Sequence, residues 1–444
     1  MNKNKIFYLA ICAFGYGLAT NLQVANLSTI LQFSGFKSHF ISYLWLIAPI
    51  TGMIIQPIIG LLSDSMNSPY GRRRPLFLIS TLLGVFSLVC LPYAHSTALI
   101  ILLIILLDIG ANGNAQLSRA LILDTAHKSE RTKAFSWSTA LAGLGAMSAG
   151  ALPWILIHVF HFSSAAEVKT DLPLYVNYTF IIGALCYLLA SMVTLIMVRE
   201  EEFTAPKTNK KIGFLHTIQG LKESIHSFPI EFWKLSYILF FAWMAIFAVW
   251  NYLNLDIAQT VFGMPVKLTD NLEKSSGYLN HANVLSSNYF GLLQLSSTLF
   301  ALMIPSLNRV FEINKLFAIG LGLGGLSLVG IAFTANTSLI AILIIFYGIG
   351  WATLSTCPYT IFGDMIPEKN IGYNMGIFNI LIVFPQIVIG LTLGTIYKYL
   401  FINNASMVIL MAGFFLLIAM FLSFNSCFKG IRSLKGKYDS VATS

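Results

Sequence analysis

The sequence predicts an all-α, polytopic membrane protein with about twelve transmembrane helices arranged as two bundles of six. Composition is the first indication: 56% of the residues are hydrophobic and 10% are charged, whereas soluble domains carry roughly 25% charged residues. The second is a series of apolar runs, each long enough to cross a hydrocarbon core of about 30 Å as a helix. The third is one long polar stretch, residues 199–231, which divides these runs six plus six.

The expected transmembrane helices follow from windowed hydropathy, with limits that are good to a few residues. The first run is too long for a cleaved signal peptide, so we interpret it as an uncleaved span. The predicted spans are residues 6–33, 40–62, 75–93, 98–123, 134–160, 174–198, 232–262, 284–305, 314–333, 339–362, 372–399 and 405–427.

These spans predict four regions of the chain. They are an N-terminal six-helix bundle (1–198), a cytoplasmic linker (199–231), a C-terminal six-helix bundle (232–428) and a cytoplasmic tail (429–444). Within the linker, residues 214–227 carry a weak helical apolar pattern. This segment suits either a helix on the membrane surface or, as we prefer, a simple tether between the bundles.

Lysine and arginine are concentrated in alternate loops. Three consecutive arginines at 72–74 lie between the second and third spans, and further basic residues lie in the linker and the tail. Because short loops rich in these residues stay in the cytoplasm, we expect a multi-pass protein of the cell (inner) membrane with both termini cytoplasmic. The net charge of +9 forms no continuous basic stripe, so we expect the lipid bilayer and no nucleic acid as a partner.

The sequence shows no pattern typical of a disulfide, a metal site or an enzyme active site. All five cysteines lie inside apolar runs, where a thiol behaves as a small hydrophobe, so we expect no disulfide, no metal site and no cofactor. No Ser/His/Asp set, metal-ligand spacing or phosphate loop is evident. We therefore expect no catalytic residues and no enzyme activity.

Ionisable residues inside predicted spans are functional candidates, because a charge at the bilayer centre costs at least about 2.5 to 3.5 kcal/mol. Asp108 and Arg119 are two of them, and at 100° per residue they lie within about 20° of one helix face, about 16 Å apart. They can line one cavity but cannot pair directly. Asp256 is a third, although it can also lie in water near the outer end of its helix.

Each candidate has a functional and a structural interpretation. We favour Asp108 as a proton carrier, because desolvation and a nearby cation shift a carboxyl pKa in opposite directions; the alternative is a packing residue hydrogen-bonded to Asn112 or Asn114. We favour Arg119 as a residue that binds sugar or compensates the charge of Asp108, and the alternative is a fixed structural ion pair.

The loop between the second and third spans predicts a gate. An acid such as Asp64 can receive the positive N-terminal end of a neighbouring helix, while arginines bridge to acids of adjacent loops and hold the inside shut. Asp124 points about 160° away from Asp108 on its helix and lies beside the loop. The predicted gating residues are Asp64, Arg72, Arg73, Arg74 and Asp124.

Amides and aromatic residues recur on several spans, which suits a cavity for a hydroxyl-rich neutral ligand. The alternative is hydrogen bonding between helices, which the same residues perform. The residues that we expect to contact the ligand are Gln23, Asn26, Asn112, Arg119, Trp243, Asn288, Tyr359, Asn379 and Gln386.

Two six-helix bundles around a midplane cavity describe the major facilitator architecture, and several segments resemble one branch of it. That branch comprises the sucrose transporters of plants and their bacterial relatives, related to the glycoside-pentoside-hexuronide symporters. Its most specific signals here are the Gly-Arg-Arg-Arg-Pro loop at 71–75 and the Arg119-Ala120 pair. The segments that carry the resemblance are 22–28, 56–75, 118–124, 240–253 and 372–386.

The resemblance implies proton-coupled uptake of a disaccharide such as sucrose or maltose. The family's fourth-helix acid, essential for coupling, falls on Asp108, and its essential arginine falls on Arg119. Asn251 and Asp256 depart from the apolar or small residues of the bacterial relatives.

We therefore predict a monomeric symporter with a sugar and protons as its partners, working by alternating access. One alternative keeps the fold and makes it an exporter or exchanger of another small solute. A second is a membrane sensor that binds sugar without moving it. The stretches 199–231 and 429–444 are too short for its signalling module, since a folded domain needs about 50 residues.

Overall fold

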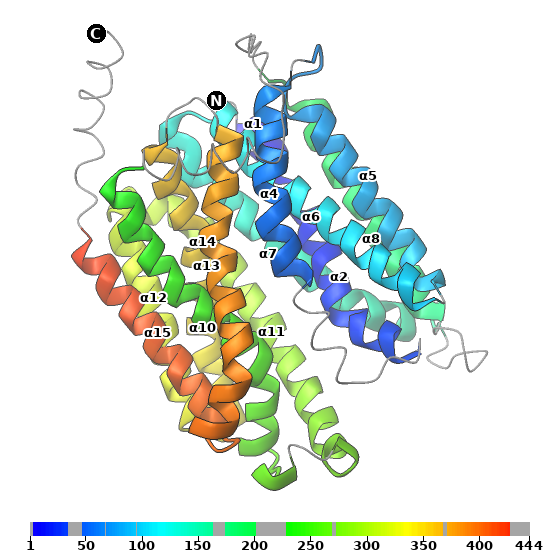
Figure 1. Cartoon of the computed structure of the whole chain (residues 1–444), viewed down its shortest axis with the longest axis vertical. Coiled ribbons are helices and arrows are strands. Elements are labelled where there is room, and N and C mark those ends of the chain that lie inside the picture. Colours follow the sequence, from blue (N-terminus) through cyan, green and yellow to red (C-terminus); the bar gives the residue numbers. More distant parts are fainter. Residues whose placement is uncertain are drawn as a thin grey trace.

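The computed structural model describes residues 3–33, 47–66, 68–94, 96–162, 174–200, 228–268, 272–366 and 371–426. Across these ranges every regular element is a helix and there is no strand. The helices form two bundles that lie side by side, the first half of the chain in blue to cyan-green and the second in green to red (Figure 1).

The first bundle contains the helices of the N-terminal half. These are α1 (Lys3–Ala10), α2 (Cys12–Phe33), α4 (Ile47–Ser65), α5 (Arg74–Cys90), η1 (Leu91–Tyr93), α6 (Thr97–Thr125), α7 (Lys128–His158) and α8 (Leu174–Met197). The second bundle contains α10 (Ile230–Thr260), η2 (Val266–Leu268), α11 (Leu272–Leu307), α12 (Ile313–Ala332), α13 (Thr337–Met365), α14 (Ile371–Thr395), the π-helical turn η3 (Ile396–Leu400) and α15 (Ala405–Asn425).

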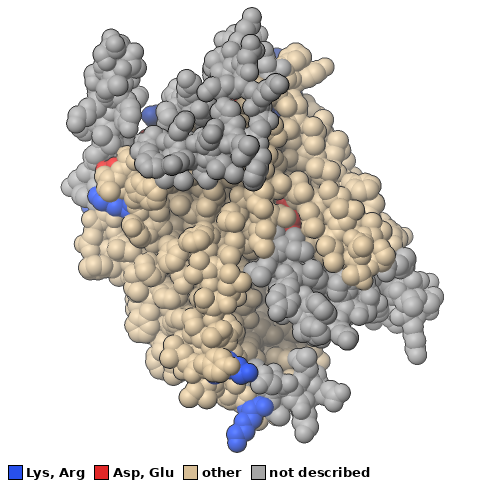
Figure 2. Space-filling view, viewed as in Figure 1, with Lys and Arg blue, Asp and Glu red and all other residues tan. Residues whose placement is uncertain are grey.

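Length and composition make this a multi-pass membrane protein. Eleven helical segments of the described chain are long and apolar enough to cross a membrane, and α4, with 19 residues, completes the two bundles. Large apolar side chains such as Phe86, Leu189 and Phe421 are exposed on the outside, and Figure 2 shows few charged residues on the sides in view. The predicted fold class is therefore confirmed.

Two helices begin well before the predicted spans. α7 begins at Lys128 and not near 134, and α11 begins at Leu272 and not near 284. Hydropathy detects only the part of a helix that crosses the hydrocarbon, whereas these helices continue as polar turns past it. Residues 201–227, with the proposed surface helix or tether, and the tail from 427 lie outside the described residues.

The two bundles contact each other through a few helix pairs, chiefly α4 with α14 and α7 with α11 and α13. At one end, which we call the charged end, lie the loop at 68–73, Asp124 and Asp364. There the α4 and α14 backbones touch: a Cβ built on Gly60 would lie 2.2 Å from the Gly372 carbonyl oxygen. Only glycine allows backbones to approach this closely.

Candidate functional site

Asp108 is buried in the middle of α6 with an incomplete set of hydrogen bonds. The residue is 3% exposed. The side chain of Gln23, from α2, hydrogen-bonds to its carboxyl group, whereas Oδ2 has no partner among the described residues. A buried carboxylate with an unpaired oxygen is costly, so this position is suited to gaining and losing a proton or to binding a ligand hydroxyl.

The two asparagines considered as packing partners of Asp108 bind elsewhere. Asn112 Oδ1 accepts a hydrogen bond from Gln56 Nε2 at 2.8 Å. Asn114 Nδ2 donates to Thr81 Oγ1 at 2.8 Å. These hydrogen bonds join α6 to its neighbours α4 and α5. The side chain that hydrogen-bonds to Asp108 is therefore that of Gln23 and not that of either asparagine.

Arg119 lies further along α6 and reaches the other bundle. Its guanidinium carbon is 4.5 Å from the centre of the Tyr359 ring on α13, a cation–π contact. The ring is held by Phe135 at 5.7 Å and Phe378 at 5.3 Å between centroids. Because no acid of the described ranges forms an ion pair with Arg119, its planar donors remain for a ligand or water.

Two pairs of predicted site residues are thus in contact: the ligand residue Gln23 with the proposed proton carrier Asp108, and the ligand residues Arg119 and Tyr359 with each other. Asp108 and Arg119 do not pair with each other in the structure. Both lie on α6, where eleven residues correspond to about 16 Å.

The other predicted ligand residues lie apart from these pairs. Asn379 and Gln386, both buried, donate to main-chain carbonyls at 3.3 and 3.0 Å. Trp243 is 8% exposed and its indole Nε1 has no acceptor among the described residues. Asn288 is exposed on α11. The side chain of Asn26 lies outside the described part of the chain.

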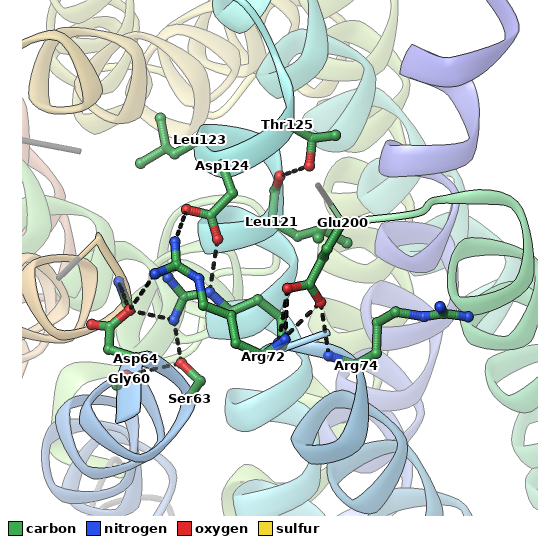
Figure 3. Close-up of polar contacts among 12 residues, drawn as sticks. Gly60, Ser63, Asp64, Arg72, Arg74, Leu121, Leu123, Asp124, Thr125 and Glu200 are labelled. Atoms are coloured by element: carbon green, nitrogen blue, oxygen red, sulfur yellow. Dashed lines mark hydrogen bonds and ion pairs between the residues drawn. The ribbon is translucent and has the colours of Figure 1, made fainter. Parts of the chain in front are cut away.

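The charged end holds a compact network of ion pairs (Figure 3). Arg73 Nη1 lies 2.6 Å from Asp64 Oδ1, and its Nε lies 2.8 Å from Asp124 Oδ2. Arg72 Nη2 lies 2.6 Å from Asp124 Oδ1. The Arg73 side chain is fully buried. Burial lowers the pKa of its guanidinium, but the charges of Asp124 and Asp64 outweigh this and raise the pKa above its ordinary value.

Asp64 also joins the two bundles. Its carboxylate accepts hydrogen bonds from the backbone N–H groups of Gly372 at 3.1 Å and Tyr373 at 2.7 Å. These residues form the N-terminal turn of α14, where free N–H groups and the helix dipole favour an anion. A Cβ on Gly372 would lie 2.3 Å from Arg73 Nη1, so this glycine also makes room for the arginine.

Glu200 is a functional candidate that the sequence analysis missed. Its carboxylate accepts hydrogen bonds from the backbone N–H groups of Arg72, Arg73 and Arg74, at 2.9, 3.0 and 3.1 Å, and so caps the start of α5. Arg74 does not join the ion pairs, because its guanidinium donates to the carbonyl of Leu195. Only two of the three predicted arginines therefore contact Asp64 and Asp124, the acids of the predicted gate.

Arg131 is a second residue that the sequence analysis missed. Its guanidinium donates to the carbonyls of Gly363 at 2.6 Å and Leu123 at 3.2 Å, and it lies 3.5 Å from Asp364. It therefore ties the ends of α6 and α13 to α7. Its presence in a basic loop was the only signal in the sequence, and topology already accounted for that charge.

Asp256 does not lie in water at the outer end of its helix, as one interpretation supposed. It is 1% exposed and accepts a hydrogen bond from Ser406 Oγ at 2.6 Å. Nearby, Gln259 Oε1 accepts from the Ala405 N–H at 2.8 Å. These contacts tie α10 to the first turn of α15, because the start of that helix favours a nearby acceptor.

Sequence comparison places the chain in a known family. Residues 9–390 match the Major Facilitator Superfamily. The chain is 26% identical over 265 residues to the general alpha-glucoside permease of Schizosaccharomyces pombe, which covers 55% of this chain and 46% of the permease. It is 24% identical over 444 residues to the sucrose transport protein SUT3 of Oryza sativa subsp. japonica, covering 88% and 86% of the two chains.

The first of these alignments spans about half of the permease. Solved structures show the same fold along nearly the whole chain. The human organic anion transporter MFSD10 superposes with a TM-score of 0.73 at 13% identity, covering 95% of this chain and 100% of that one. The proton:xylose symporter XylE superposes with a TM-score of 0.67 at 15% identity, covering 95% of each chain. The chain therefore belongs to the Major Facilitator Superfamily, and the similar proteins named above are transporters and not enzymes.

Proposed function

We propose that this protein takes up a sugar together with a proton, and that the sugar is a disaccharide such as sucrose or maltose. The observation that carries the proposal is the buried carboxyl group of Asp108, which has Gln23 as a partner and one oxygen that finds none in the described part of the chain. The similarity to sucrose and alpha-glucoside transporters supports the choice of substrate.

In this mechanism Asp108 takes up a proton before the bundles move. A neutral carboxyl group is much less costly to enclose than a carboxylate, so protonation favours the occluded state. The sugar hydroxyls bind Gln23 and the free donors of Arg119, which already contacts the second bundle through Tyr359. Ligand contacts shared by both bundles favour the state in which they close around the site.

The network at the charged end serves as the gate. Asp64 on α4 and the N-terminal turn of α14 come from different bundles, so their separation opens that end. If the charged end is cytoplasmic, as the basic loops predict, the described conformation is closed toward the cytoplasm. We place the protein in the cell (inner) membrane as a monomer with cytoplasmic termini, and we retain the boundaries 1–198, 199–231, 232–428 and 429–444.

Sugar-driven proton entry into proteoliposomes tests the proposal. Purified protein would be reconstituted with an internal pH dye, and sucrose, maltose and a set of monosaccharides added in turn. We expect wild type to acidify the lumen with a disaccharide, and Asp108→Asn to bind the sugar without moving protons. Asp256→Asn is the matched control, because Asp256 is also buried in a membrane helix but is tied to Ser406.

Two results would count against this function. Proton movement by Asp108→Asn at the wild-type rate would remove Asp108 from the coupling step. Sugar exchange that ignores the proton gradient in wild type would favour the exporter or exchanger alternative.

A further inference from the structure

Three tryptophans of the second bundle pack edge to face. Trp243 and Trp250 come from α10 and Trp351 comes from α13. Their ring centroids are 6.3 Å apart for Trp243 and Trp250, 5.7 Å for Trp243 and Trp351, and 5.6 Å for Trp250 and Trp351. We call these residues the tryptophan cluster. Trp250 is 44% exposed, so part of the cluster remains uncovered.

The cluster faces the first bundle. α10 contacts α13 through the tryptophan cluster. It contacts α14 through Phe240, whose ring centroid lies 6.3 Å from that of Phe384. α13 and α14 each contact the first bundle, through α7 and through α4 and α6. The face of α10 between them therefore points toward that bundle, and it carries Trp250 and the exposed Asn251.

The cluster lies at nearly the same depth as Asp108. α6 and α13 run in the same direction, because Arg131 bonds to the carbonyls near both of their ends. Arg119 is 22 residues beyond Thr97 and Tyr359 is 22 residues beyond Thr337, and the two side chains are in contact. Asp108 lies eleven residues before Arg119, so it is level with position 348 of α13, which lies eleven residues before Tyr359. Trp351 is three residues from that position, or about 4.5 Å along the helix axis.

One polar atom of the cluster lacks a partner. Trp243 Nε1 is buried and has no acceptor among the described residues, although a buried indole N–H normally finds one. The ring of Trp250 lies against it and is partly exposed. A hydroxyl of a ligand that stacks on the exposed part of Trp250 can therefore supply the missing acceptor.

We infer that the tryptophan cluster binds one ring of a disaccharide, by stacking on its C–H face and by donating from Trp243 Nε1, while α6 binds the hydroxyls of the other ring. Aromatic faces suit the apolar face of a pyranose, and polar side chains orient its hydroxyls. A monosaccharide fills only one of the two subsites. This inference rests on the proposed function and specifies which groups select the length of the sugar.

Binding affinities for sugars of two lengths test the inference. Dissociation constants for maltose, sucrose and glucose would be measured by calorimetry on purified wild type, Trp250→Ala and Trp243→Phe. We expect Trp250→Ala to weaken disaccharide binding about tenfold or more, as expected for a lost ring contact, and to change glucose binding less than about twofold. Trp243→Phe keeps a ring and removes the N–H, so we expect a smaller loss that is again confined to disaccharides.

Trp154→Ala is the matched control, because Trp154 is an exposed tryptophan of α7 that stacks on His158. Thermal unfolding of each variant would show that it is folded. Equal losses for glucose and the disaccharides, no loss in Trp250→Ala, or a wild type that binds only glucose would overturn the inference. A wild type that binds none of the sugars would instead overturn the proposed function.

Discussion

Replacing Gly60 by alanine tests whether contact between backbones holds the charged end closed. A Cβ at this position would lie 2.2 Å from the Gly372 carbonyl oxygen, and ordinary contact begins at 3.4 Å. The difference, 3.4 minus 2.2, is 1.2 Å, and because the obstructing atom belongs to a helix backbone, α4 and α14 must separate by about that distance. Overpacking of this kind costs about 1 to 3 kcal/mol. At 1.4 kcal/mol per factor of ten, the closed state loses about 5- to 140-fold in its equilibrium constant.

Distances between spin labels would measure the change. Labels at Ser65, at the end of α4, and Lys315, near the start of α12, are on different bundles and both positions are exposed. In a background without native cysteines, Gly60→Ala should shift the distance distribution toward longer values. Gly291→Ala on α11 is the control, because a Cβ there meets nothing within 4 Å. Identical distributions in wild type and both variants would refute the role of this backbone contact.

Three further substitutions probe the contacts around the gate and the second bundle. Asp64→Asn leaves the fully buried Arg73 without one of its acids, so we expect the same spin-label pair to report opening, with a cost of about 3 to 5 kcal/mol. Glu200→Gln weakens the cap of α5 by about 0.5 to 1 kcal/mol and should lower the apparent Tm in detergent, whereas an unchanged Tm would argue against the cap. Ser406→Ala leaves Asp256 buried without its donor; we expect a loss of about 1 to 3 kcal/mol in thermal stability with sugar-driven proton entry retained, and a stable variant without proton entry would contradict this structural role.

The fold was predictable because hydropathy acts on each helix separately. A run of apolar residues forms a membrane helix whatever its neighbours are, and the polar stretch at 199–231 sufficed to divide the runs. The ion pairs between Asp64 and the arginines were also predictable, since these residues lie within ten positions of one another in the sequence. What hydropathy cannot detect is a helix that continues as polar turns beyond its apolar run, which is why the starts of α7 and α11 were misplaced.

The contacts between bundles were not predictable from one sequence. Arg119 meets Tyr359, and Arg131 meets Gly363, across more than 200 residues of chain, and no local period links such positions. Glu200 stands first in a row of three acids, and nothing in that row indicates which carboxylate caps α5. The charge of each side chain is evident from the sequence, but its partner depends on how the bundles pack.

Proton coupling through Asp108 is tested by comparing uphill accumulation of a disaccharide with its exchange in the same vesicles. If Asp108 carries the coupled proton, Asp108→Asn should lose accumulation driven by a pH gradient and keep the exchange of labelled for unlabelled sugar, because exchange requires no net proton transfer. Wild type and Asp256→Asn should perform both. Uphill accumulation by Asp108→Asn at the wild-type level would show that Asp108 does not carry the coupled proton.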